Sequence, residues 1–356
     1  MLKTIDSLGD LKGKKVLVRS DINVPISDGE ITDDGRIVAA IPTIQKLLDE
    51  GASVIVMAHR GRPGGKFNMD FSLELPAKRM GELLGQEVVL ADDVTGDSAK
   101  SLAADLKPGQ VMMLENVRFD PRESSKDDAE RVEFAGELAA LGDAFVSDGF
   151  GVVHRKAASV YDIAQILPSA AGELVFKEID SLSKVTDDPE RPYVVILGGS
   201  KVSDKLAVIK NLLDKANTLL IGGGMAFTFL AAEGYEVGSS LLEEDQLETV
   251  RGYLKDAKEK GVNLVLPVDV VVAPEFNADA PATVVPVSEI PADQMGLDIG
   301  PETVALFGEY ILGAKTVAWN GPMGVFEFDA FANGTKGVAA ALSESEAFTV
   351  IGGGDS

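Results

Sequence analysis

The amino-acid sequence predicts an α/β protein made of two doubly wound parallel-sheet (Rossmann-like) domains joined by a hinge helix. Short apolar runs alternate along the chain with segments in which apolar residues recur at a helical period. Strand–helix alternation of this kind is typical of parallel sheets covered by helices on both faces. With 356 residues, the chain is also too long for a single ordinary hydrophobic core, which favours two domains.

The predicted strands are short, apolar and bounded by polar residues or glycine. They comprise residues 15–19, 53–57, 110–114, 144–147, 193–197, 218–221, 263–266, 316–318 and 348–351. The helical period between them predicts helices that include residues 36–48, 129–141, 201–213 and 328–342. Ligands bind at the carboxyl ends of strands in such sheets, so the segments that follow the strands are the candidate binding loops.

A long helix is expected to divide the chain. Apolar residues spaced along one helix face run from Leu174 to Val185, and Asp187-Asp188-Pro189 ends the pattern. We therefore predict an N-terminal domain over residues 1–168, an interdomain hinge helix over residues 169–188 and a C-terminal domain over residues 189–356.

Composition argues against several classes of protein. The chain carries 33 lysines and arginines against 57 aspartates and glutamates, a net charge of −24, which disfavours nucleic acid and anionic membranes as partners. The sequence has no cysteine, which excludes disulfides, thiolate catalysis and zinc–cysteine sites. Neither a signal peptide nor an apolar run long enough to span a bilayer is recognisable, so we expect a cytoplasmic protein.

Cationic and hydrogen-bonding residues follow the predicted strands of the first half. They are Asp21, Asn23, His59, Arg62, Arg118 and Arg155, together with Arg36 at the start of the helix at 36–48. Any one of them alone could be a surface ion-pair partner or a structural residue. Several arginines at one end of a sheet, in so acidic a chain, instead predict a small substrate with more than one anionic group, because the guanidinium fork matches carboxylate and phosphate oxygens. Asp21 fits such a site if it accepts a hydrogen bond from a substrate hydroxyl.

A glycine pair follows the strand at 193–197 and leads into two lysines. Gly198 and Gly199 precede Lys201 and Lys205. The spacing of the lysines places both ammonium groups on one face of the predicted helix at 201–213. Lysines are unfavourable at the positive end of a helix dipole unless an anion binds there. Backbone N–H groups, dipole and lysines would then all attract the anion, so this junction predicts a phosphate site.

Further glycine-rich segments follow other strands of the second half. They are Gly222-Gly223-Gly224, the run Trp319-Asn320-Gly321-Pro322-Met323-Gly324-Val325-Phe326-Glu327, and Gly352-Gly353-Gly354-Asp355-Ser356. Glycine lets the backbone approach a ligand closely, and consecutive N–H groups can cradle phosphate. Asp355 is placed to hold Mg²⁺ beside such a cradle, and Glu327 to bond a ribose hydroxyl. Neither the P-loop sequence nor the G-x-G-x-x-G fingerprint occurs, which argues against a P-loop NTPase and against a nicotinamide-dependent dehydrogenase.

Six motifs together resemble the phosphoglycerate kinase family in order and spacing, over the whole chain. They are R-S-D-I-N-V-P, H-R-G-R-P, E-N-V-R-F, G-G-S-K-V-S-D-K, W-N-G-P-M-G-V-F-E and G-G-G-D-S. The resemblance implies a glycolytic kinase that reversibly transfers a phosphoryl group from 1,3-bisphosphoglycerate to MgADP, giving 3-phosphoglycerate and MgATP. It also implies a monomer, Mg²⁺ bound with the nucleotide, and closure of a cleft between two domains about the joining helix.

The resemblance assigns roles by position. The 3-phosphoglycerate site would comprise Asp21, Asn23, Arg36, His59, Arg62, Arg118 and Arg155. The nucleotide site would comprise Gly198, Gly199, Lys201, Lys205, Gly222, Gly223, Asn320, Pro322, Glu327, Gly353, Gly354, Asp355 and Ser356, with Asp355 as the metal ligand. Phosphoryl transfer from an acyl phosphate needs positioning and charge neutralisation and no general base. The predicted catalytic groups are therefore those that stabilise the transferring phosphoryl: Arg36, Lys201, Lys205, Gly353 and Gly354.

Three departures from the family pattern carry expectations of their own. Arg60 replaces an apolar residue, and is expected either to add charge to the acid site or to point to solvent. Ala157 stands at a position where family members commonly have histidine, and we assign no role to Ala157. Family members continue beyond G-G-G-D-S, whereas this sequence ends at Ser356, so we expect a C-terminally truncated nucleotide domain, reduced stability and weak activity. The alternative function is an inactive fragment that binds 3-phosphoglycerate only.

Overall fold

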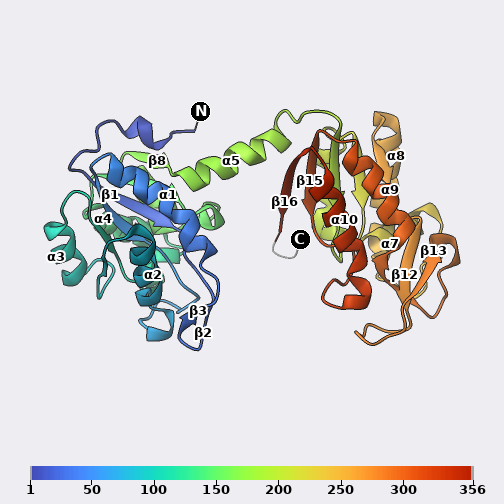
Figure 1. Cartoon of the computed structure of the whole chain (residues 1–356), viewed down its shortest axis with the longest axis horizontal. Coiled ribbons are helices and arrows are strands. Elements are labelled where there is room, and N and C mark those ends of the chain that lie inside the picture. Colours follow the sequence, from blue (N-terminus) through green and yellow to red (C-terminus); the bar gives the residue numbers. More distant parts are fainter. Residues whose placement is uncertain (1, 354–356) are drawn as a thin grey trace. The chain divides into compact units, whose positions relative to one another are not determined.

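The computed structural model describes residues 2–353 (Figure 1). The chain forms two compact units, Met1–Asp180 and Ser181–Ser356. The boundary between them lies inside helix α5 (Glu173–Thr186), which occupies most of the predicted joining helix. The domain limits at 168/169 and 188/189 stay predictions. In the described part of the chain, no helix is both long enough and apolar enough to cross a membrane.

The first unit is built on a six-stranded parallel sheet with the strand order β5-β6-β4-β1-β7-β8. The strands are β1 (Lys15–Ser20), β4 (Ser53–Met57), β5 (Val88–Leu90), β6 (Val111–Met113), β7 (Ala144–Asp148) and β8 (Ser169–Ala171). The helices are α1 (Gly35–Asp49), α2 (Glu74–Leu84), α3 (Asp97–Asp105) and α4 (Asp128–Ala139). A short antiparallel hairpin, β2 (Ile26–Ser27) and β3 (Glu30–Ile31), comes between β1 and α1 in the sequence.

Alternate side chains of the central strands enter two separate cores, one on each face of this sheet. In β1, Val16 and Val18 pack in the core that contains buried residues of α1 and α2. Leu17, between them, packs in the core that contains buried residues of α3 and α4. The strand period of two therefore produces the doubly wound arrangement that the sequence predicts.

The second unit contains a five-stranded parallel sheet with the order β11-β10-β9-β15-β16. The strands are β9 (Tyr193–Leu197), β10 (Thr218–Ile221), β11 (Asn263–Val265), β15 (Thr316–Asn320) and β16 (Phe348–Gly352). The helices are α6 (Leu206–Leu212), α7 (Ala226–Glu233), α8 (Leu247–Lys260), α9 (Pro301–Leu312) and α10 (Asn333–Glu344). In β9, Val195 packs with α6, α7 and α8, whereas Val194 packs with α9 and α10. The fold class is thus confirmed in both units.

A small antiparallel sheet in the second unit was not predicted. Its order is β13-β12-β14, and its strands are β12 (Asp269–Ala273), β13 (Thr283–Pro286) and β14 (Met295–Ile299). Val270 and Val272 of β12 pack in one core with Phe227 of α7. The small sheet therefore adds a wall beside α7, where a cavity lies.

Two helices begin later than predicted. Helix α6 begins at Leu206 and not at residue 201, and α10 begins at Asn333 and not at residue 328. Before α6, the Ser203 backbone N–H and hydroxyl both donate to the Glu243 carboxylate, at 3.1 and 2.6 Å, and Ser203–Lys205 forms a single 3-10 turn. A 3-10 turn, Asp329–Phe331, also precedes α10. The prediction that Lys201 and Lys205 share one helix face is therefore wrong, because Lys201 precedes the helical turns.

Candidate active site

The carboxyl ends of the parallel strands bring the predicted anion-binding residues of the first unit to one edge of its sheet. Loops that leave β1, β4, β6 and β7 carry most of them, and the first turn of α1 carries Arg36. In strand order they are Asp21 and Asn23, His59 and Arg62, Arg118, and Arg155. Parallel pairing explains the convergence, because all these strands end on the same side.

Hydrogen bonds tie three of these loops together. Arg36 Nη1 is 2.9 Å from Asp21 Oδ2. Asn23 Oδ1 accepts a hydrogen bond from the Gly61 N–H at 3.0 Å, and the Gly61 carbonyl accepts one from Arg118 Nη1 at 2.8 Å. The segments after β1, β4 and β6 are thus held in fixed register around Gly61.

His59 lies buried among positive charges. The residue is 5% exposed, and its Nδ1 is 3.1 Å from Arg19 Nη2. The pKa of His59 is lowered to about 2, first by burial and then by four nearby guanidinium groups, those of Arg19, Arg118, Arg155 and Arg36. His59 is therefore neutral, and the positive charge of the site comes from arginine.

A cavity of about 380 Å³ lies among these loops. Three of the predicted binding residues line it, Arg62, Arg118 and Arg155, and the carboxylates of Asp120 and Glu123 line it as well. Arg62 and Arg155 are exposed, so their guanidinium groups are available to a ligand. All the residues predicted for this site are thus linked by contact, by a shared cavity or by their charge effect on His59.

Arg60 takes neither of its two expected positions. Its Nη1 donates to the carbonyl oxygen of Asp70 at 2.5 Å and to that of Ser72 at 3.4 Å. The side chain is half-buried, and burial lowers the pKa of its guanidinium. Arg60 therefore fastens the segment before α2 and does not add charge to the anion site.

Backbone hydrogen bonds hold the glycine loops of the second unit together. The Gly199 N–H donates to the Pro322 carbonyl at 3.0 Å, and the Gly223 N–H donates to the Met323 carbonyl at 3.0 Å. Gly223 has a φ of +64°, and a Cβ atom there would lie 2.6 Å from the Gly199 backbone. Close packing of three loops thus requires glycine at position 223.

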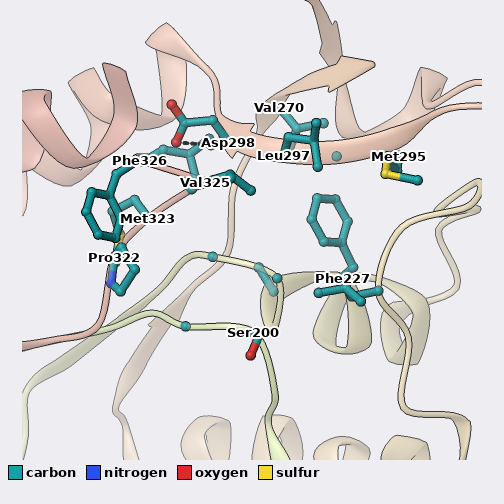
Figure 2. Close-up of a pocket in the computed structure, with 18 of the residues that line it drawn as sticks. Ser200, Phe227, Val270, Met295, Leu297, Asp298, Pro322, Met323, Val325 and Phe326 are labelled. Carbon is teal, nitrogen blue, oxygen red and sulfur yellow. Dashed lines mark hydrogen bonds between the residues drawn. The ribbon is translucent and has the colours of Figure 1, made fainter. Parts of the chain in front are cut away.

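These loops form part of the wall of a cavity of about 570 Å³ (Figure 2). Of the residues predicted for nucleotide binding, Gly199, Gly223, Pro322 and Glu327 line it. Figure 2 shows mostly apolar side chains around the space, among them that of Phe227. An apolar cavity with backbone polar groups at one edge suits a flat ring system that carries a polar tail.

Asn320 connects a predicted catalytic lysine to the last strand. Lys205 Nζ donates to Asn320 Oδ1, and Asn320 Nδ2 donates to the Gly352 carbonyl at 2.8 Å. The Lys205 ammonium group is therefore placed at the carboxyl ends of β15 and β16.

The remaining nucleotide-site predictions are placed less completely. Gly198 and Gly222 lie in the glycine loops but not in the cavity lining, and Lys201 is exposed in the loop before the 3-10 turn. Gly353 follows β16 with a φ of +105°. The predictions for Gly354, Asp355 and Ser356 lie outside the described residues.

The described residues hold no preformed magnesium site. Among residues 2–353, no three His, Asp or Glu side chains gather as a preformed metal site. Mg²⁺ is commonly held by one or two carboxylates together with nucleotide phosphates and water. Asp355, which is predicted to hold the metal, lies outside the described residues.

Two buried charged residues of these sites were not predicted. Asp298, 3% exposed, lines the larger cavity, where its Oδ2 accepts the Gly334 N–H at 2.7 Å and its Oδ1 the Ile299 N–H at 2.9 Å. Burial raises its pKa to about 7, although both hydrogen bonds oppose the shift. Arg19 contacts His59 from inside β1. A charged residue within a predicted apolar strand is the sequence signal that could have found Arg19, whereas the strand that carries Asp298 was not predicted.

The fold and the two cavities define a two-unit α/β protein: one unit gathers arginines at a cavity, and the other surrounds a larger, mostly apolar cavity with glycine loops. The family model for phosphoglycerate kinase matches residues 5–356. The chain belongs to the phosphoglycerate kinase family, and it is a kinase. The resemblance seen in the sequence motifs is thereby confirmed.

Similar proteins agree with this assignment. The phosphoglycerate kinase of Bifidobacterium longum (strain DJO10A) is 61% identical over 361 residues, covering 100% of this chain and 90% of the relative. That of Leifsonia xyli subsp. xyli is 58% identical over 360 residues, covering 100% and 89%. Among solved structures, phosphoglycerate kinase from Coxiella burnetii has a TM-score of 0.90 at 40% identity, covering 99% of this chain and 88% of that one. The structure from Pyrococcus horikoshii has a TM-score of 0.78 at 32% identity, covering 99% and 89%. The alternative of a binding-only fragment is not favoured.

Proposed function

We propose that this kinase transfers a phosphoryl group reversibly between 1,3-bisphosphoglycerate and MgADP, giving 3-phosphoglycerate and MgATP. The observation that carries the proposal is the gathering of arginines at this sheet edge in a chain of net charge −24: Arg36, Arg118 and Arg155 act on His59, and Arg62 lines a cavity with Arg118 and Arg155. Such a site suits a small molecule with a carboxylate and a phosphate. Asp21 and Asn23 supply acceptors and donors for the substrate hydroxyl and carboxylate.

The nucleotide is proposed to occupy the 570 Å³ cavity of the second unit. Its base and ribose would lie among the apolar side chains, with Glu327 at the ribose hydroxyls. Its phosphates would extend to the loops with Gly199 and Gly353 and to Lys201 and Lys205. Asp355 and the nucleotide phosphates would hold Mg²⁺, which would neutralise negative charge on the phosphate oxygens.

Catalysis in this proposal is charge neutralisation without a general base. The transferring group carries negative charge on its equatorial oxygens. Arg36 stabilises that charge from the substrate side, and Lys205, which Asn320 positions, stabilises it from the nucleotide side. The backbone amides of Gly353 and Gly354 would add further hydrogen-bond donors. We further propose that α5 acts as a hinge and that the enzyme works as a cytoplasmic monomer.

Separate calorimetric titrations with 3-phosphoglycerate and with MgADP test the two sites. The wild-type protein is expected to bind both. Arg62→Ala should weaken 3-phosphoglycerate binding by roughly ten- to hundredfold, the value of a charge-assisted hydrogen bond, and leave MgADP binding unchanged. Lys100→Ala, which removes a positive charge from α3 in the same unit, is the matched control. If the wild-type protein binds 3-phosphoglycerate but does not bind MgADP, the binding-only alternative is favoured. If Arg62→Ala binds 3-phosphoglycerate as tightly as wild type, the proposed substrate site is excluded.

A further inference from the structure

Arg19 is a buried arginine whose guanidinium contacts three elements of the first unit. The residue is 2% exposed and lies in β1. Its Nε donates to Ser159 Oγ at 2.9 Å, its Nη1 to the Ser20 carbonyl at 2.5 Å, and its Nη2 lies 3.1 Å from His59 Nδ1. Arg19 is absent from the lining of the substrate cavity, so it has no direct role in the binding proposed above.

The contacts of Ser159 fix which groups of this network donate hydrogen bonds and which accept them. The Ser159 hydroxyl donates to Glu123 Oε1 at 2.6 Å, and its backbone N–H donates to Glu123 Oε2 at 3.0 Å. Because the Ser159 O–H donates its hydrogen bond to Glu123, an oxygen lone pair of the same hydroxyl accepts the hydrogen bond from Arg19 Nε. Glu123 is 2% exposed and balances the charge of Arg19 through the serine. The guanidinium is therefore held by a serine whose orientation is fixed by two hydrogen bonds to the Glu123 carboxylate.

The donor-only guanidinium of Arg19 determines which ring nitrogen of His59 carries the proton. Arginine has five N–H donors and no acceptor. The His59 Nδ1 that faces Arg19 Nη2 must therefore accept a hydrogen bond, and an accepting Nδ1 carries no proton. A neutral imidazole with a bare Nδ1 has its proton on Nε2, so Nε2–H is the only donor that this ring can offer to a ligand.

The geometry points to Arg19 as a positioning residue, held by Ser159 and Glu123, that keeps His59 neutral with its proton on Nε2. The inference rests on the proposed role of His59 in binding the anionic substrate. The largest electrostatic effects on His59 come from cationic groups: Arg19, Arg118, Arg155 and Arg36. They oppose a further charge on the ring, in agreement with its lowered pKa. His59 thus supplies a hydrogen bond whose strength does not change over the pH range in which a free histidine titrates.

Nitrogen NMR of the wild-type protein, labelled with ¹⁵N in its histidine rings, tests this directly. The chain has only 2 histidines, His59 and His154, so a His154→Gln variant assigns the signals. We expect His59 to show an unprotonated Nδ1 and a protonated Nε2, with no titration between about pH 5.5 and 8.5. A proton on Nδ1, or a titration of His59 within that range, would overturn the inference.

Two substitutions of Arg19 separate a group that can only donate from one that can also accept. Arg19→Gln places an amide beside His59 Nδ1 that can donate or accept, so part of the His59 population should carry its proton on Nδ1 in the NMR spectrum. Burial and the remaining arginines should still keep the ring uncharged. The KM for 3-phosphoglycerate should rise by up to roughly fivefold, because the Nε2–H donor is lost in that part of the population. Arg19→Lys supplies only donors and should keep the proton on Nε2. Equal tautomer populations in the two variants would contradict the inference.

Ser159→Ala provides a second route if Arg19→Gln does not fold. It leaves Arg19 in place without its Nε acceptor, and should produce a mixture of His59 tautomers in the NMR spectrum. An unchanged spectrum would exclude the role of Ser159 and Glu123. A failure of the proposed substrate site would look different from a failure of this inference. His59 would then show the expected tautomer, but adding 3-phosphoglycerate would not shift its Nε2 signal.

Discussion

Arg36 Nη1 lies 2.9 Å from Asp21 Oδ2, so the guanidinium proposed for catalysis is paired with a carboxylate of the substrate site. The Arg36 side chain is 56% exposed and that of Asp21 is 13% exposed. An ion pair this close to solvent contributes only about 0–1 kcal/mol to folding. The pair therefore contributes little to folding stability. We expect that Arg36 can give up its ion pair with Asp21 and bind a substrate oxygen at a small cost in free energy.

Arg36→Ala should lower kcat by about 100-fold or more while changing KM for 3-phosphoglycerate much less, because its charge is needed most in the transition state. The melting temperature should stay near that of wild type. Steady-state kinetics and thermal unfolding check both statements. A change confined to KM would leave Arg36 as a binding residue without a catalytic role.

Gly223→Ala should destabilise the second unit and weaken MgADP binding. The added Cβ would lie 2.6 Å from the Gly199 backbone at a φ of +64°, so one of the packed loops must shift. We expect a loss of roughly 1–3 kcal/mol. Gly252→Ala is the matched control, since Gly252 lies in α8 with nothing within 4 Å of an added Cβ, and alanine favours a helix. Equal unfolding curves for the two variants would show that the loops are not packed as described.

Asn320 and Lys205 should act as a unit. Asn320→Ala removes the acceptor that positions the Lys205 ammonium group and the donor to Gly352. Each single alanine variant should lower kcat/KM for MgATP by about tenfold or more. In a double-mutant cycle, the combined loss should fall short of the sum by about 1 kcal/mol. Strictly additive losses would mean that Asn320 does not position Lys205.

Asp298 should make stability depend on pH near neutrality. Its native pKa is raised to about 7 from an ordinary value of 3.8, so the native state holds a proton that the unfolded chain releases. The stabilisation is therefore complete below the unfolded pKa and is lost as the pH rises through about 7. Between about pH 5 and 8, the free energy of unfolding of wild type should fall by roughly 2–3 kcal/mol more than that of Asp298→Asn, measured by urea unfolding. Parallel pH curves for the two proteins would refute this assignment.

Most of the parallel sheets could be predicted from sequence because their strands are buried on both faces. Continuous apolar runs gave the bounds of β4, β9 and β10 as the structure has them. The antiparallel β12–β14 sheet escaped prediction. Thr283–Pro286 is largely exposed, and Met295–Ile299 contains a glycine and an aspartate, so neither reads as a clear apolar or alternating run.

The candidate site was predictable where a residue acts through its loop position, and not where it acts through a partner distant in sequence. Arg62 and Arg118 follow strands and were found in that way. The late start of α6 depends on Glu243, which lies 40 residues beyond Ser203. The role of Arg19 depends on Ser159, 140 residues away. Local periodicity contains no information on either contact.

The central claim is that an arginine site and a glycine-loop site in one chain together perform phosphoryl transfer. The most direct measurement is the back reaction, in which MgATP and 3-phosphoglycerate are supplied and the acyl phosphate formed is consumed by a coupled dehydrogenase. We predict a rate that saturates with each substrate and disappears when Mg²⁺ is removed by a chelator and returns when it is restored. A folded protein that binds 3-phosphoglycerate but shows no such rate would contradict the account.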